Sequence, residues 1–427
     1  MKHYFSKNGM KIAKLFATGA TILMLCRFAW LKGGTDNGLF YYAARAILSG
    51  HNVYDREWVF QEWILDGSPK SLDPHSFSGY INPPCLAVFY IPALLLKPKF
   101  AYYAIVAINF LAALCVAIAL PKSSKQFTKS QVYLFAGFVL LTPSVFEIIQ
   151  YGQSSLISFA LIAIGLLSLS RTKQIAGGIL FGLALSKFTL AIPFILYFAL
   201  CRRWRAFIAA VVAFTVLNLI LILPAGVPQT LKSYKALLSV ESGENTSYDP
   251  MTKVYRYRPD LIIDAKRASV LIVGNNRSRA TFLNWILSAL IAGGVIYLRV
   301  TKKFKGEPFS HPLETPLLMI AALLLFYHRH YDLAGTLFAV FGLAEYGLKQ
   351  PERRTTLWKS AVFIALLLVC PVFFQLKNPL SNIHPLAGLV ATHYYAPLGL
   401  CLLFVLIWLI CCCEEGDGKG DKENSLH

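Results

Sequence analysis

The chain has 427 residues, of which 56% are hydrophobic and 15% are charged, and its mean hydropathy is +0.54. Soluble domains carry about 25% charged residues, so this composition excludes an ordinary soluble protein and indicates an integral membrane protein in contact with membrane lipids. The formal net charge of +19 does not indicate a nucleic-acid partner, because the basic residues lie in short clusters between apolar segments, as expected of cytoplasmic loops.

Apolar segments of membrane-spanning length recur along the whole chain, since a helix needs about 20 apolar residues to cross a bilayer. The clear candidates are 11–31, 100–120, 131–149, 155–170, 205–224, 281–298, 313–327, 333–348, 357–375 and 394–413. Two further segments are ambiguous. Segment 83–96 is short and rich in proline, and segment 174–200 is long with Lys187 in its middle.

Loop charge decides how the ambiguous segments are arranged. Lysines before and within segment 11–31 place the N-terminus in the cytoplasm, and the absence of a small-residue cleavage site makes this segment a retained first span. If 83–96 is interfacial or re-entrant and 174–200 is a hairpin of two short helices, the basic clusters that follow residues 120 and 170 also face the cytoplasm. The opposite arrangement, with 83–96 spanning and 174–200 as one helix, places those clusters outside.

The chosen layout predicts an all-α, polytopic bundle of about 12 transmembrane helices with both termini in the cytoplasm. Residues 1–413 form a single membrane domain in the plasma membrane, with long outer loops at 32–99 and 225–280. Residues 414–427 form a disordered tail. The cysteines form no CxxC pair that would indicate a disulfide or zinc site. Cys411 to Cys413 end the last apolar segment, either as small membrane residues or as palmitoylation sites.

The first outer loop carries a half-polar helix, predicted over residues 38–48. Tyr41, Tyr42 and Arg45 cluster on one of its faces at helical spacing, which is typical of a helix at headgroup depth. Asp36 precedes this helix. From local pattern it is either a helix cap, worth about 1 kcal/mol, or a catalytic carboxylate.

Three further polar features are predicted on the same outer face. Lys187 is a functional candidate, because a charge at the centre of a membrane helix costs at least about 2.5–3.5 kcal/mol; the alternative is a snorkelling lysine. Gln153 follows an outer helix end, where it either closes a turn or contacts a ligand. The stretch from His328 through His330 to Asp332 lies between two spans and offers no third metal ligand, but a histidine there can bind a phosphate or orient a base.

These motifs together resemble glycosyltransferase family 87. The resemblance covers roughly residues 30–350 and rests on an acidic residue before a Tyr-Tyr pair, Gly-x-x-x-Tyr from Gly50, "YINPP" from Tyr80, Gly152-Gln153, "AGGILFGLALSK" and "CRRWR". It implies a GT-C fold, which is a polytopic helical bundle with juxtamembrane helices on its outer face. It also implies a lipid-linked sugar donor, since well-known members are polyprenyl-phosphate-mannose-dependent mannosyltransferases.

The resemblance also assigns roles to individual residues. Asp36 matches the acidic catalytic residue of the first outer loop, Lys187 a recurrent lysine, and His330-Tyr331 a later histidine motif. This chain reads "HRHYD" in that region, so His328 and His330 are alternatives for the site histidine. The C-terminal spans offer no match, which leaves the acceptor open.

The chemistry expected of such a donor fits these residue types. Its phosphate is already a leaving group, so the enzyme must activate an acceptor hydroxyl and stabilise the departing negative charge. Asp36 suits the first task, and the cations Arg45, Lys187 and His330 suit the second. The remaining predicted donor- or acceptor-binding residues are Tyr41, Tyr42, Gln153 and Tyr331. No glycine-rich nucleotide loop is present, and without an Asp-x-Asp motif neither a metal nor another cofactor is predicted.

The predicted function is a membrane glycosyltransferase that moves a hexose from a polyprenyl-phosphate sugar to a lipid or glycan acceptor. Mannose is the hexose that the resemblance suggests, and the reaction lies on the extracytoplasmic face with inversion at the sugar. The alternative is a multi-span transporter, or a flippase for lipid or glycan, with an outward-facing polar site. A transporter of the inverted-repeat type has matched broken helices in its two halves, and the sequence predicts only one such hairpin.

Overall fold

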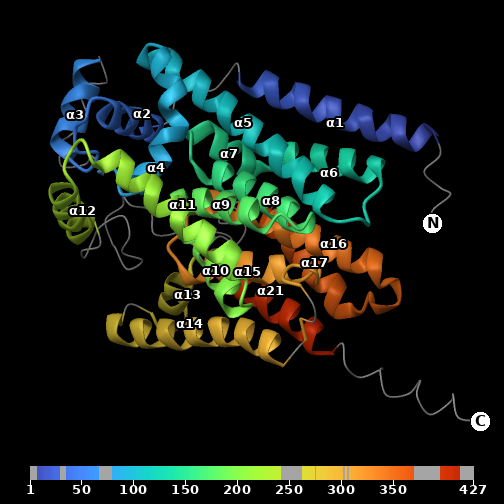
Figure 1. Ribbon diagram of the computed structural model, residues 1–427. Helices are drawn as coiled ribbons and strands as arrows, with labels where there is room; N and C mark the ends of the chain where they lie inside the picture. The colour runs from blue at the N-terminus through green and yellow to red at the C-terminus, as the bar shows by residue number, and fades with distance from the viewer. Residues whose placement is uncertain are drawn as a thin grey trace, which may run out of the picture. The chain divides into compact units, whose positions relative to one another are not determined.

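The computed structural model describes residues 7–28, 35–66, 79–241, 262–274, 276–301, 303–304, 307–369 and 395–413. The regular structure of these residues is helical, with a single isolated β-bridge between Ile262 and Arg329. By its internal contacts the chain divides into two compact units, each described by itself (Figure 1). Unit 1 is Met1–Ala199 with Arg203–Pro259, and unit 2 is Leu200–Arg202 with Asp260–His427. The single domain expected over 1–413 stays a prediction.

Helices long and apolar enough to cross a bilayer confirm the class of all-α, multi-pass membrane protein. Within the described residues there are 5 such runs, or up to 6 if one bent pair counts as a span. The pair is Lys129–Leu141 and Pro143–Tyr151, which meet at 55°. The predicted span 131–149 is therefore broken, because proline removes a helical hydrogen bond and clashes with the preceding turn. The larger number of spans expected from the sequence is not confirmed.

Unit 1 consists of helices that follow one another through short connections. They are α1 (Lys7–Phe28), α2 (Thr35–Leu48), α3 (Arg56–Leu65), α4 (Pro84–Ala87), the 3-10 helix η2 (Val88–Leu95), α5 (Pro98–Ser123), α6 (Lys129–Leu141), α7 (Pro143–Tyr151), α8 (Ser155–Ser170), α9 (Gln174–Ala184), the 3-10 turn η3 (Leu185–Lys187), α10 (Phe188–Leu200), α11 (Trp204–Ile222) and α12 (Val227–Glu241). Prolines open α4, α5 and α7, where the missing N–H would have no helical partner.

Segment 174–200 folds back on itself at η3. The ring of Phe181 in α9 lies 5.5 Å from the ring of Phe194 and 5.0 Å from the ring of Phe198, both in α10. A straight helix would hold Phe181 and Phe198 roughly 25 Å apart. The segment is long enough to pass as one span, but these contacts confirm the hairpin that loop charge predicted.

Two glycines fix the direction of the next helix. A Cβ on Gly178 would lie 2.3 Å from the carbonyl oxygen of Ala206, and one on Gly182 would lie 2.4 Å from that of Ala210. Only glycine permits this approach, as in other closely packed membrane helices. Because both pairs ascend together, α11 runs parallel to α9, which is possible only if α10 returns between them.

One end of unit 1 gathers α2, η2, α7, the first turn of α8 and η3; we call it the α2 end. Lys187 Nζ in η3 donates a hydrogen bond to Ser155 Oγ at the start of α8. The hydroxyl of Tyr102, near the start of α5, donates to the carbonyl of Gln150 at 3.3 Å. Arg27, near the end of α1, lies 4.0 Å from the ring centroid of Phe146 in α7.

The basic loops lie at the opposite end of unit 1. Helix α5 has 26 residues and rises about 1.5 Å per residue, so Lys122 at its end is a bilayer thickness away from the α2 end. Lys14, early in α1, lies over the ring of Tyr133 in the first half of α6. Lys173 follows α8 and precedes α9. This segregation agrees with the predicted layout, and the side of the membrane that each end faces stays a prediction.

Unit 2 is built around a buried helix. Its elements are α13 (Ala265–Val273), α14 (Arg277–Val300), α15 (Glu314–Leu325), η6 (His330–Thr336), α16 (Leu337–Lys349), η7 (Pro351–Arg353), α17 (Thr356–Val369) and α21 (Tyr395–Cys412). Nearly every residue of α15 is buried, as expected of an apolar helix that packs against α14, α16 and α21. The expected tail 414–427 lies outside the described residues.

Candidate functional site

Helix α2 begins at Thr35, earlier than the start at Gly38 that the sequence predicts. Asp36 therefore lies in the first turn of the helix. An N-cap residue precedes its helix with extended backbone angles, so Asp36 does not occupy the cap position that was its alternative reading. A carboxylate in the first turn is favoured by the positive end of the helix dipole. The side chain of Asp36 lies outside what the structure describes.

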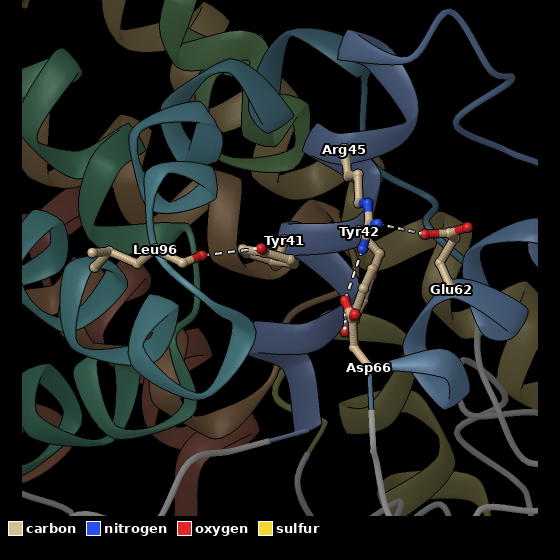
Figure 2. A network of polar contacts seen from close by, with 6 residues as sticks. All are labelled: Tyr41, Tyr42, Arg45, Glu62, Asp66 and Leu96. Atoms are coloured by element: carbon tan, nitrogen blue, oxygen red, sulfur yellow. Dashed lines mark hydrogen bonds and ion pairs between the residues drawn. The ribbon is translucent and has the colours of Figure 1, made fainter.

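Arg45 joins α2 to α3 through two carboxylates (Figure 2). Its Nη1 donates to Asp66 Oδ2 at 2.7 Å, and its Nη2 lies 3.1 Å from Glu62 Oε2. The hydroxyl of Tyr42 donates to the same Asp66 oxygen at 3.1 Å. Burial, and then the Asp66 carboxylate, raises the pKa of Tyr42 and keeps this donor protonated. Arg45 is thus neutralised locally, and any phosphate would compete with Glu62 and Asp66 for it.

The two tyrosines of α2 are packed against protein. Tyr41 is 7% and Tyr42 is 2% exposed, so neither ring lies open at headgroup depth as the sequence suggested. The hydroxyl of Tyr41 donates to the carbonyl of Leu96 at 3.2 Å (Figure 2). The structure does bring Tyr41, Tyr42 and Arg45 together, and it anchors them to η2 and α3.

A chain of contacts leads from α2 to the start of α8. The ring of Phe40 stacks on that of Tyr90 at 4.8 Å, and the hydroxyl of Tyr90 donates to the carbonyl of Gly152 at 3.3 Å. Gly152 ends α7 with a φ of 68°, a left-handed conformation that favours glycine. Gln153 follows it and is buried. The Gly-Gln pair is therefore positioned by α2 through two aromatic rings.

Lys187 and the first turn of α8 form a buried polar cluster. Besides the bond from Lys187 to Ser155, the hydroxyls of Ser158 and Ser186 are buried and have no hydrogen-bond partner among the described residues. The N-terminus of α8 adds the positive end of a helix dipole. A cation, a helix N-terminus and buried hydroxyls together suit an anion such as a phosphate.

Unit 2 holds the predicted histidines at the start of η6. His328 is fully buried, and its Nδ1 lies 3.0 Å from Asp332 Oδ2. His330 is half-buried, and its ring lies 5.6 Å from that of Tyr331. His328 is thus held by an internal carboxylate, whereas His330 and Tyr331 are partly accessible. Because these residues belong to unit 2, their position relative to Asp36 and Lys187 stays a prediction.

The structure adds residues that the sequence did not indicate. Ile263 N–H donates to the carbonyl of His328 at 3.1 Å, which places Asp264 beside the histidine segment. Burial raises the pKa of Asp264 to about 6, although the backbone N–H of Arg267 opposes this by donating to its carboxylate. Arg329 Nε donates to the hydroxyl of Tyr327 at 2.9 Å. No short motif marks these positions, because a bridge between distant segments brings them together.

Metal ligands were also sought around both groups of residues. Across the described part of the chain there is no group of three or more His, Cys, Asp and Glu side chains placed to hold a metal ion.

Comparison with known proteins identifies the family. The model of glycosyltransferase family 87 matches residues 80–326, which is more than half of the chain. Gln153 and Lys187 lie within the matched residues, whereas Asp36 and His330 lie outside them. Neither the curated proteins nor the solved structures contain a match to this chain. The match over so much of a multi-pass helical chain means that this protein belongs to glycosyltransferase family 87 and is a membrane glycosyltransferase.

Proposed function

We propose that the enzyme transfers a hexose from a polyprenyl-phosphate sugar to a lipid or glycan acceptor at the extracytoplasmic surface. The observation that carries this proposal is the shared location of α2, Gln153 and Lys187 at the α2 end of unit 1. That end lies opposite the basic loops of the same unit, which are expected in the cytoplasm.

The lipid-linked donor is supported by the cluster around Lys187. A polyprenyl tail remains in the bilayer, so its phosphate is held where membrane helices end. Lys187, the first turn of α8 and the hydroxyls of Ser158 and Ser186 offer a cation and hydrogen-bond donors at that depth. Stabilising the departing phosphate in this way lowers the barrier to glycosyl transfer.

Asp36 is the proposed general base. It accepts the proton of the acceptor hydroxyl as that oxygen attacks the anomeric carbon, while the donor phosphate leaves from the opposite face with the bonding electrons. The sugar is therefore transferred with inversion. In this proposal Tyr41, Tyr42 and Gln153 line the substrate region, and His330 with Tyr331 contacts the donor.

The competing function is transport or flipping of a lipid or glycan. The activity test compares transfer of radiolabelled hexose from a polyprenyl-phosphate sugar with flux of the same compound across proteoliposomes. We expect transfer to a lipid or glycan acceptor without net flux. Flux without transfer would contradict the proposed reaction.

The layout of unit 1 makes a separate prediction for chemical labelling. Cysteines introduced at Ser124, after α5, and at Ser170, at the end of α8, are expected to resist membrane-impermeant thiol reagents in intact cells. Leu65 at the end of α3 is 77% exposed, so a cysteine there is expected to react. The measurement uses a background without native cysteines. Reaction at Ser124 and Ser170 with protection at Leu65 would reverse the assigned sides.

A further inference from the structure

An apolar groove runs along unit 2 between α14 and α21, which lie side by side in Figure 1. Its volume is about 400 Å³, which is within the usual range of ligand pockets. The lining includes Leu290, Gly293, Tyr297, Phe404 and Trp408, and it contains no charged side chain. Since α14 is a candidate membrane span, this groove faces the hydrocarbon region of the bilayer.

Glycine opens the groove. A Cβ on Gly294 would touch Phe404 at 3.4 Å, so this residue sets the approach of α21. A Cβ on the neighbouring Gly293 would meet nothing within 4 Å, and the space beside it belongs to the groove. Leu290, one turn earlier, is 65% exposed. The two helices are thus in contact on one side of the glycine pair and leave a slot on the other.

The polarity of the groove changes along its length. The apolar part extends over about 15 Å of α14, and the rings of Tyr297 and Trp408 close it at a centroid distance of 6.0 Å. Just beyond, Lys303 Nζ donates to the carbonyl of Cys412 at 3.1 Å. Apolar slot, aromatic pair and ammonium follow the order of acyl chain, ester region and phosphate in a lipid.

We propose that this groove is a binding site for an anionic phospholipid. One acyl chain lies in the slot beside Gly293, the glycerol ester region packs against Tyr297 and Trp408, and the phosphate faces Lys303. The positive charge selects an anionic headgroup, because a lysine near the membrane surface attracts such lipids. This site is independent of the proposed transfer reaction, and it gives the enzyme a preference for anionic membranes.

The test uses the full-length protein reconstituted in vesicles with equal amounts of phosphatidylglycerol and phosphatidylcholine. Lipids retained after transfer to detergent are identified by native mass spectrometry. We expect phosphatidylglycerol on the wild type. Gly293→Leu fills the slot without touching α21, and retention is expected to fall about tenfold, which the loss of contact with two methylene groups is enough to cause. Lys303→Gln is expected to keep a lipid but lose the preference for phosphatidylglycerol.

Gly19→Leu in α1 is the matched control, because a Cβ there also meets nothing within 4 Å. It is expected to retain lipid like the wild type. Equal retention in Gly293→Leu and the wild type would overturn the proposal. So would a retained polyprenyl phosphate in place of phospholipid, or a dimer that Gly293→Leu dissociates while lipid stays bound.

Discussion

Replacing Lys187 with methionine is expected to raise the half-saturating concentration of the polyprenyl-phosphate donor about tenfold to a hundredfold. A hydrogen bond to a charged group contributes about 1.5–3 kcal/mol, and each 1.4 kcal/mol is a factor of ten. Methionine keeps the length and apolar stem of the side chain, so helix packing at η3 is retained. Donor saturation is measured at fixed acceptor concentration, with thermal stability recorded on the same preparations.

Lys173→Met is the matched control for this experiment. Lys173 precedes α9, at the opposite end of the same helix from η3, and it is exposed. It is expected to leave donor saturation unchanged, and Lys187→Arg is expected to restore part of the affinity. If Lys187→Met saturates like the wild type, the lysine serves packing with Ser155 and does not bind the donor.

The sequence predicted the hairpin at residues 174–200 because loop charge and membrane length act over many residues. A wrong choice there would have moved whole basic clusters across the bilayer, a large effect that counting charges detects. The bend within 131–149 was also encoded, since Pro143 breaks a helix. It was overlooked because hydropathy averages over the break.

Other features could not be read from the sequence. Asp66 and Glu62 are surface residue types, and nothing local indicates that both would turn toward Arg45. Likewise, the position of Asp264 beside His328 depends on a backbone bridge between segments far apart in the chain. Periodicity reports which face of a helix is buried, but it carries no information on which distant side chains meet.

Asp36→Asn is expected to lower the rate of transfer about 10²–10⁴-fold, the usual contribution of general base catalysis. Asparagine has nearly the same shape but accepts no proton. If Asp36 only favours the start of α2 through the helix dipole, the change costs about 0.3–1 kcal/mol of stability and leaves turnover nearly intact. The measurements are transfer rate at saturating donor and melting temperature.

Asp55→Asn separates these two roles, because Asp55 is an established cap in the same outer loop. Its Oδ1 accepts the N–H of Trp58 at 3.1 Å at the start of α3. Asparagine caps a helix as well as aspartate, so Asp55→Asn is expected to keep both stability and turnover. A large loss of rate in Asp36→Asn alone, with both proteins equally stable, requires a carboxylate at position 36 for the chemistry. Near-wild-type rates in both would leave Asp36 a role at the helix start and assign the base to another residue.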